Sequence, residues 1–377
     1  MTDSQFLAGI FFADDDVIWA TASVTDREFA YPGMVFRSNP DFINKSDPQK
    51  PPHAQRFPSN PNATDDVAEA VARLAESADI SKIEAVTTAS IGPFQDGISG
   101  LVAGGSIISG ARLQKWSGFD LAGAVESEFA KYGNDHVIVR CLTDAEAMVL
   151  GEHYHFRQFR LRGHTHGSKA YREKEYKLGQ DTVAYILLDS GVGGAVFQRN
   201  YFKRGEASLE IGHTVAYPPP GLEDKYPVAN CGAHYLPCLE GTISLPALKE
   251  FWHLTAEDIR SLGSDSETLR WLSFYIAQAV HHMTLFFTPT VVLLGGRVVS
   301  NPHILEHTRT MYEDLMKNER GNQLYPDYKA QYDREEYIKL WSRPDAGVLG
   351  CLCWSFRSAR HGKDGRKNVG YLAEVGW

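Results

Sequence analysis

The hydrophobic pattern at the start of the chain predicts a β-hairpin. Two runs rich in β-branched and aromatic residues, 7–13 and 17–24, lie on either side of the acidic segment 14–16. Such runs around a short polar segment are typical of two strands joined by a tight turn. The segment 31–61 holds seven prolines among polar residues, so we expect a long loop or an irregular flap there.

Beyond this loop, strand and helix patterns alternate. Thr64 is placed to cap a helix, since two aspartates follow it and apolar residues then recur on one face. The pattern predicts further helices at 121–133 and 269–287, strands at 83–91, 136–142, 182–190, 195–198 and 290–296, and a glycine turn at 191–194. This alternation indicates a parallel or mixed α/β sheet. Because the strand at 290–296 is apolar without alternation, we expect it to be buried on both faces.

Length and charge narrow the function class. A chain of 377 residues exceeds the size at which single cores stop growing, so two domains are expected. The 38 basic and 47 acidic residues give a net charge of −9, which disfavours nucleic acid and anionic membranes as partners. With no apolar run of about 18 residues and no basic leader, we predict a cytoplasmic protein that acts on a small molecule.

A cluster of cysteine and histidine predicts a metal site. Cys231, His234 and Cys238 follow one another at short spacing, and His213 lies 18 positions upstream of the first. Two thiolates and two imidazoles are the ligands of a tetrahedral structural zinc. The alternative is two small buried cysteines that happen to lie near two surface histidines. Glycine and proline around the cluster favour a tight loop around an ion.

Five motifs carry a family resemblance. In chain order they are TDAEAMVLGE at 143–152, SGVGGA at 190–195, EIGH at 210–213, CLEG at 238–241 and LLGGRV at 293–298. This order resembles the ROK family of bacterial sugar kinases and repressors over nearly the whole chain. ASIGP at 89–93 and the Cys-x2-His spacing are most similar to the fructokinase branch, although the zinc loop is one residue longer here. Since the first strand starts near Leu7, we expect no DNA-reading domain.

The resemblance implies a fold and a domain division. The fold is an α/β, actin-like or ribonuclease H-like pair of lobes that close on a sugar, with a structural zinc loop. The first lobe would cover 1–142, joined by a last helix at about 355–377, and the second would cover 143–354. Members of the family are commonly homo-oligomers, so a dimer is expected.

The resemblance also implies site residues. Asp144 would be the base that takes the proton of a sugar hydroxyl; the alternative role is to cap the helix that follows, and the two roles are compatible. The residues implied in sugar binding are Thr143, Glu210, His213, Glu240, Gly92 and Pro93, and those implied in binding Mg-ATP are Ser190, Gly191, Gly193, Gly194, Gly295 and Gly296. His213 would also bind zinc through its other ring nitrogen.

Two departures from the family pattern affect the phosphate site. The first glycine turn is replaced by aromatic and acidic residues that include Asp14, and Asp189 replaces a glycine in the second turn. A carboxylate about 4 Å from a phosphate costs a few kcal/mol at an effective dielectric near 20, so these changes disfavour ATP. Two facing carboxylates would instead hold a divalent cation or share a proton. For Asp14, a solvated hairpin tip is the alternative.

Three functions follow from these patterns. The first is a carbohydrate kinase, a transferase that phosphorylates a fructose-like hexose. The second is a glycoside hydrolase type of enzyme that pairs Asp144 with Asp189 or Asp14. The third is a non-catalytic, sugar-binding pseudokinase. The segment 157–177 holds seven basic residues and two acids, and we interpret it as a lid or anion site, or as a solvated helix pair or subunit contact.

Overall fold

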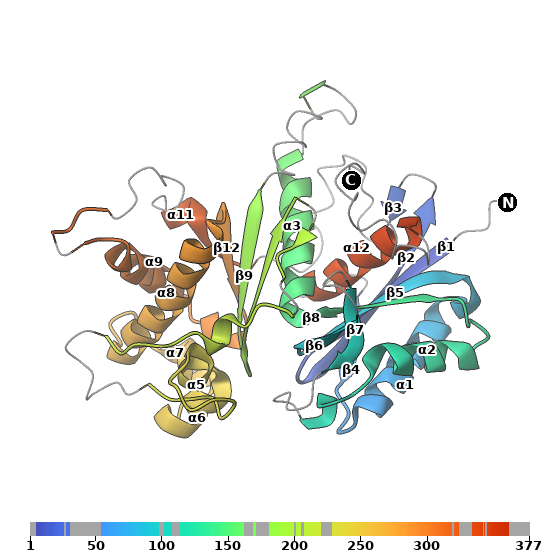
Figure 1. Ribbon diagram of the computed structural model, residues 1–377, viewed down its shortest axis with the longest axis horizontal. Helices are drawn as coiled ribbons and strands as arrows, with labels where there is room; N and C mark the ends of the chain where they lie inside the picture. Colours follow the sequence, from blue (N-terminus) through green and yellow to red (C-terminus); the bar gives the residue numbers. More distant parts are fainter. Residues whose placement is uncertain are drawn as a thin grey trace. The chain divides into compact units, whose positions relative to one another are not determined.

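The computed structural model forms two compact units, which are described separately below (Figure 1). The first comprises Met1–Gln180, Arg199–Ser208 and Ser342–Trp377, and the second comprises Asp181–Gln198 and Leu209–Trp341. The structure describes residues 5–25, 28–30, 54–97, 102–107, 114–161, 169–170, 181–199, 201–204, 207–219, 228–318, 320–323, 334–341, 343 and 345–361. Among these residues, no helix has both the length and the apolar character needed to cross a bilayer.

A mixed sheet forms the centre of the first unit. Its strands run in the order β3-β2-β1-β5-β8, with β4 paired to β2. Their bounds are β1 (Gln5–Phe12), β2 (Asp16–Thr25), β3 (Glu28–Ala30), β4 (Gln55–Pro58), β5 (Ile83–Ser90) and β8 (Ile138–Thr143). β1 pairs antiparallel with β2 and parallel with β5, and β5 pairs parallel with β8. The predicted hairpin, the buried strand near residue 83 and the α/β class are thus confirmed. A separate hairpin joins β6 (Phe94–Gly97) and β7 (Val102–Ile107).

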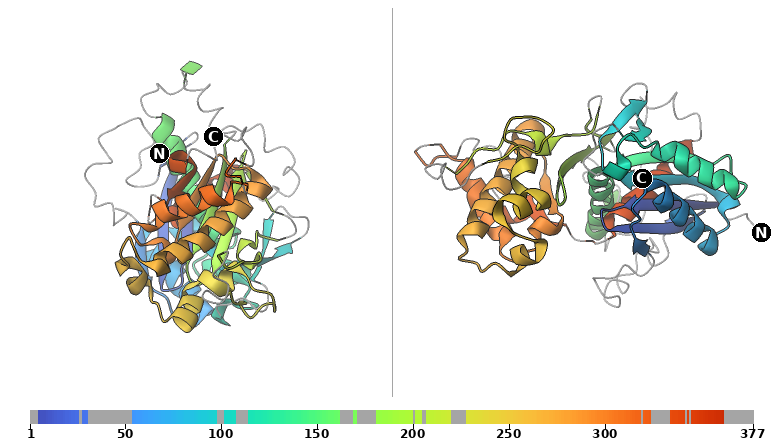
Figure 2. Two further views of the ribbon diagram at one scale, coloured as in Figure 1. Left: turned by 90° about the vertical axis from the view of Figure 1, so that its left-hand side faces the viewer. Right: turned by 90° about the horizontal axis from the view of Figure 1, so that it is seen from below.

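Helices cover both faces of this sheet (Figures 1 and 2). On one face, α1 (Ala63–Ser77) and α2 (Leu121–Lys131) pack on the side chains of Ala8, Ile10 and Phe12. On the other, α12 (Ala346–His361) lies so close to β1 that a Cβ on Gly9 would come 3.0 Å from the Cβ of Cys351. Alternate residues of β1 therefore face the two helical layers, as the period of a strand requires.

Two local predictions in the first unit are corrected. Part of the predicted loop at 31–61 is strand β4, since Phe57 is buried and the segment pairs with β2; residues 31–53 lie outside the described ones. Asn62, which has extended backbone angles, occupies the N-cap position of α1 without a capping hydrogen bond from its side chain, and Thr64 lies inside the helix. A side chain within the helical turns cannot act at the N-cap position.

The domain boundary also differs from the prediction. Helix α3 (Asp144–Leu161) was expected to open the second lobe but belongs to the first unit, where it packs on α12. The packing is close because glycines meet backbone: a Cβ on Gly350 would come 1.9 Å from the carbonyl oxygen of Ala147, and one on Gly151 would come 1.9 Å from that of Ala346. The last helix, expected from about 355, begins at Ala346.

The second unit is built on a smaller sheet with strand order β10-β9-β12-β13. The bounds are β9 (Thr182–Leu188), β10 (Val192–Gln198), β12 (Val291–Gly295) and β13 (Ile338–Leu340). β9 and β10 form the predicted hairpin, and β12 pairs parallel with β9 and β13. β12 is buried throughout, as its apolar pattern predicted. The glycine turn is shorter than expected, because Gly193 and Gly194 already lie in β10.

Six helices belong to the second unit. They are α5 (Leu239–Ile243), α6 (Leu245–Trp252), α7 (Ala256–Ser261), α8 (Glu267–Phe287), α9 (Ile304–Leu315) and α11 (Arg334–Tyr337), among the residues described. Leu272, Ile276 and Met283 of α8 are completely buried in the core, so α8 is the helix on which this unit is packed. The two-residue strand β11 (Tyr201–Phe202) lies in a segment that belongs to the first unit.

The contact between α3 and α12 gives a stability prediction. Gly350→Ala places a methyl group against the Ala147 carbonyl of α3, and such overpacking costs about 1–3 kcal/mol. The gain in helix propensity, about 0.5–1 kcal/mol, is smaller. We expect Gly350→Ala to unfold at a lower urea concentration than the wild type, with the unfolding transition measured by tryptophan fluorescence. Ser127→Ala, at an exposed site of α2, is the control and should leave the midpoint unchanged; an unchanged midpoint in Gly350→Ala would contradict the close contact.

Candidate functional site

In the first unit, four predicted site residues lie at the carboxyl ends of β5 and β8. The two strands are parallel, and Ser90 near the end of one lies opposite Thr143 at the end of the other. Gly92 follows β5 closely enough that a Cβ there would come 2.7 Å from Cγ2 of Thr143, and a cis peptide joins it to Pro93. Asp144 comes directly after Thr143. In open α/β sheets, ligands bind at this edge.

The start of α3 is closed by a capping box. The hydroxyl of Thr143 accepts the backbone N–H of Glu146 at 3.2 Å, and the Glu146 carboxylate accepts the backbone N–H of Thr143 at 2.9 Å. Asp144 is the first residue of the helix, and its Oδ1 accepts the N–H of Ala145 at 2.6 Å. The alternative in which Asp144 caps the helix is therefore wrong, because Thr143 does so. The positive end of the helix dipole stabilises the Asp144 carboxylate.

A buried ion pair supports this capping box. The sequence did not predict it. The guanidinium of Arg204 binds both carboxylate oxygens of Glu146, through Nε and Nη2. Glu146 is 2% exposed, so its charge needs a partner within the protein. The two residues are 58 positions apart, and no local pattern marks them as a pair.

In the second unit, three acceptor groups gather beside the hairpin turn. Glu210 precedes the short helix η4 (Ile211–His213), and its Oε2 lies 3.7 Å from Nε2 of His213. Glu240, in α5, accepts the backbone N–H of Val192 at 3.1 Å, just after the turn between β9 and β10. Loss of hydration around Glu210, whose side chain is 44% exposed, and the negative charge of Glu240 raise the pKa of Glu210. These groups suit the hydroxyls of a polyol.

The four predicted metal ligands are also brought together in this unit. Ligand atoms of His213, Cys231, His234 and Cys238 all lie within 4.8 Å of one another. Sγ of Cys231 is 3.4 Å from Nδ1 of His213, close to the edge of about 3.6 Å expected of a tetrahedral zinc with one sulfur and one nitrogen ligand.

Two further observations fit a metal at this cluster. Nε2 of His234 is buried and has no hydrogen-bond partner in the described part of the chain. Sγ of Cys238 accepts the backbone N–H of Gly241 at 3.2 Å, as a thiolate ligand commonly does. His213 joins the two groups of residues, because Nδ1 faces Cys231 and Nε2 faces Glu210.

In the turn between β9 and β10, the carboxylate of Asp189 was expected to repel phosphate, and the structure shows a different arrangement. Asp189 accepts hydrogen bonds from the backbone and the guanidinium of Arg297, so its charge is compensated. Ser190 and Gly191 complete the turn. Gly194 has a packing role, since a Cβ there would come 2.6 Å from Cγ2 of Ile211.

The remaining predicted positions are placed as follows. Asp14 is half-buried at the turn between β1 and β2, where Asp15 is exposed. Asp14 belongs to the first unit and Asp189 to the second, so a pairing of the two stays a prediction. In the basic segment 157–177, α3 continues to Leu161, and 162–168 and 171–177 lie outside the described residues.

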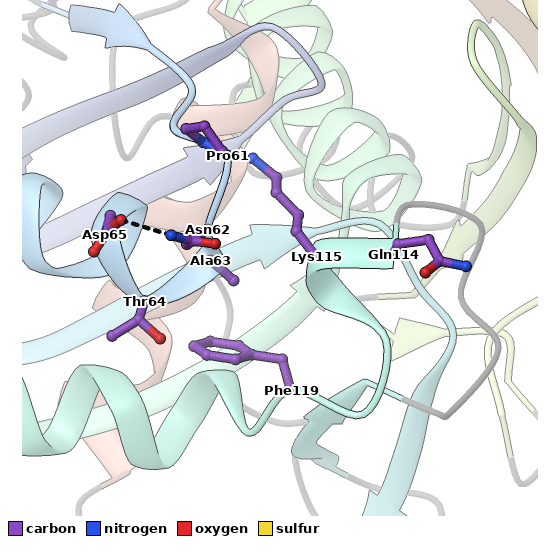
Figure 3. Close-up of a pocket in the computed structure, with 8 residues that line it drawn as sticks. All are labelled: Pro61, Asn62, Ala63, Thr64, Asp65, Gln114, Lys115 and Phe119. Atoms are coloured by element: carbon purple, nitrogen blue, oxygen red, sulfur yellow. Dashed lines mark hydrogen bonds between the residues drawn. The ribbon is translucent and has the colours of Figure 1, made fainter.

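A pocket of about 490 Å³ lies at the start of α1, and Figure 3 shows Lys115 reaching across it. The ammonium group of Lys115 donates to the buried carboxylate of Asp66 at 2.7 Å, to the carbonyl of Asn60 at 3.0 Å and to the hydroxyl of Ser59. Three donors are all that an ammonium group has, so Lys115 is fully used in holding the unit together. None of the predicted site residues lines this pocket.

Comparison with known sequences adds a family match. Residues 167–352 match the model of the ROK family. A fructokinase from Streptococcus mutans is 28% identical over 171 residues, which are 45% of this chain and 54% of the relative. A fructokinase from Lactococcus lactis is 28% identical over 173 residues, 46% of this chain and 54% of the relative. The chain thus spans about half the length of these curated relatives.

Solved structures match nearly the whole chain. The ROK hexokinase from Thermus thermophilus gives a TM-score of 0.60 at 17% identity, covering 95% of this chain and all of the other. A ROK family glucokinase from Streptomyces griseus, in complex with glucose and AMPPNP, gives 0.57 at 18% identity, covering 94% of this chain and all of the other. At this identity the match establishes the fold. Residues 167–352 therefore belong to the ROK family, and the chain has the two-sheet, actin-like α/β fold of ROK sugar kinases.

Proposed function

We propose that the protein is a carbohydrate kinase that transfers the γ-phosphoryl group of Mg-ATP to a hydroxyl of a fructose-like hexose. The observation that carries this proposal is the group formed by Glu210, His213 and Glu240 beside the turn between β9 and β10. Sugar hydroxyls need several acceptors in fixed positions, and the donor phosphates need backbone N–H groups nearby. The second unit offers both on neighbouring elements.

Asp144 is the proposed base. Its carboxylate takes the proton of the sugar hydroxyl as the oxygen attacks the γ-phosphorus, and the bond from that phosphorus to ADP breaks. Magnesium, when bound with the nucleotide, neutralises charge on the phosphates. Thr143 and Glu146 hold the backbone on both sides of Asp144 through the capping box. Gly92 lies against Thr143, and Gly92 and Pro93 are proposed to contact the sugar.

The Cys/His cluster is proposed to bind a structural zinc. The chain provides His213, Cys231, His234 and Cys238, and zinc would fix the tautomer and orientation of the His213 ring. A fixed ring presents Nε2 in one direction, toward Glu210. The metal would thereby order the acceptor group of Glu210, His213 and Glu240 without itself contacting the sugar. The predicted homodimer and cytoplasmic location stay predictions.

The hydrolase alternative is less well supported. It needs a second carboxyl group that donates a proton to a leaving group. Both oxygens of Asp189 accept hydrogen bonds, from the Ser190 N–H and from Arg297, so this side chain is engaged as an acceptor. A sugar-binding pseudokinase would share the sugar site and differ only in lacking turnover.

Replacement of the proposed base gives the first test. Asp144→Asn removes the group that accepts the proton, and loss of a general base lowers kcat by about 10²- to 10⁴-fold. The sugar KM should change little. A coupled ADP-release assay over fructose, glucose and mannose measures both values.

Asp135→Asn is the matched control, since that side chain is 72% exposed in the same unit. We expect wild-type kcat from it. Retention of more than about a tenth of kcat in Asp144→Asn would exclude this residue as the base. A thermal shift with a sugar but no ADP release in the wild type would overturn the kinase proposal and leave the hydrolase and the pseudokinase, which cleavage of a disaccharide would separate.

The metal gives a second test. Elemental analysis should find one zinc per chain, and Cys231→Ser should lose it and raise the sugar KM about 10- to 100-fold, because His213 is no longer oriented. His136→Ala is the control, because this side chain is 83% exposed and belongs to the first unit. Full metal content in Cys231→Ser would show that Cys231 is not a ligand of the ion.

The pH dependence of the metal has a definite sign. Burial raises the pKa of the Cys238 thiol to about 11, so below that pH the metal-free thiol holds a proton that zinc must displace. The affinity for zinc should therefore increase as the pH rises from 6 to 8. Competition with a chromogenic chelator at several pH values measures this trend, and an affinity independent of pH would contradict it.

A further inference from the structure

Asp189 and Arg297 form an ion pair at one edge of the sheet of the second unit. Asp189 follows β9 directly, and Arg297 follows β12 after one glycine. Because these strands are parallel, with Gly295 opposite Leu187, their carboxyl ends meet at the same edge. The pair therefore joins the turn between β9 and β10 to the loop after β12.

The contacts of Asp189 are more specific than those of an ordinary surface ion pair. Oδ1 accepts the N–H of Ser190 at 2.9 Å and Nε of Arg297 at 2.8 Å, and it also contacts Nη2. Oδ2 accepts the backbone N–H of Arg297 at 2.8 Å. Two of the four donors belong to the backbone, so the carboxylate is fixed in place whatever the guanidinium does.

The two glycines before Arg297 make this approach feasible. A Cβ on Gly295 would come 1.8 Å from the hydroxyl of Tyr185. Gly296 has φ +98°, and a Cβ there would come 2.1 Å from the carbonyl oxygen of Leu188. The loop thus lies directly against the end of β9, which brings the N–H of Arg297 to Asp189.

The pair also has a defined charge balance. A lone carboxylate in this turn would repel a phosphate chain, and a lone guanidinium would attract one, by similar amounts at similar distances. The Arg297 side chain is 44% exposed and that of Asp189 is 19% exposed, so the positive group is the more accessible of the two. The two charges together leave the turn close to neutral.

We propose that the Asp189–Arg297 pair sets the affinity of this edge for the phosphate chain of the phosphoryl donor. Arg297 is the residue that attracts the anion, and Asp189 positions its guanidinium and offsets its charge. This inference rests on the proposed function, which places the donor at this turn. The ligand class is a chain of linked phosphates, either on a nucleoside or as inorganic polyphosphate.

The test is a double-mutant cycle on binding to the full-length chain. Isothermal titration with Mg-ATP and, separately, with magnesium tripolyphosphate measures the wild type, Asp189→Asn, Arg297→Gln and the double variant. We expect Asp189→Asn to bind about tenfold more tightly and Arg297→Gln about tenfold more weakly, with the double variant near the wild type. Arg297→Lys keeps the charge but loses the two guanidinium contacts to Asp189, so its affinity should lie between those of Arg297→Gln and the wild type.

Asp314 and Lys317 provide the matched control. They form an exposed ion pair in the same unit, and Asp314→Asn and Lys317→Gln should not change phosphate binding. Equal responses to both ligands would assign recognition to the phosphates alone, and tighter binding of Mg-ATP would add a contact to the nucleoside.

The opposite signs separate this proposal from a purely structural role. If both single variants weaken binding and lower the thermal midpoint alike, the pair only joins two loops and the proposal is overturned. If Asp189→Asn strengthens and Arg297→Gln weakens phosphate binding while no sugar is phosphorylated, the inference stands and the kinase proposal fails. If sugars are phosphorylated but neither variant changes the KM for Mg-ATP, the kinase proposal stands and the inference fails.

Discussion

The parallel pairing of strands is the constraint on which the site depends. Parallel strands end at the same edge of a sheet, so residues far apart in the chain are brought together wherever two such strands stop. In the first unit this edge holds Gly92 after β5 and Thr143 with Asp144 after β8. In the second it holds Asp189 after β9 and Arg297 after β12. Both groups follow from hydrogen bonding of the backbone.

Two carboxylates near these edges are each neutralised by an arginine. Asp189 is bound by Arg297, and Glu146, beside the proposed base, is bound by Arg204. Arginine suits both positions, because its planar fork matches the two oxygens of a carboxylate. The acidic excess of the chain does not mean that its sites repel anions, since the local charge depends on which basic side chain lies beside each acid.

His213 connects two kinds of chemistry in the second unit. One ring nitrogen faces the thiol of Cys231 and the other faces the carboxylate of Glu210. Neighbours on both sides restrict the orientation of the ring more than those of a free surface histidine would. Gly241 belongs to the same arrangement, because it follows Glu240 and donates its N–H to Cys238. The Cys/His cluster and the acceptor group are therefore neighbours along the chain as well as in space.

The sequence alone determined features that depend on short separations along the chain. Hydrophobic periodicity fixed the two hairpins and the buried strand β12, and spacing within 26 residues fixed the Cys/His cluster. The sequence did not reveal the partners of Glu146 and Asp189, which lie 58 and 108 positions away. It predicted instead that Asp189 repels phosphate or faces another carboxylate. Only the tertiary structure decided these pairs, because a side chain's partner depends on which strands the sheet brings together, and local patterns do not encode that order.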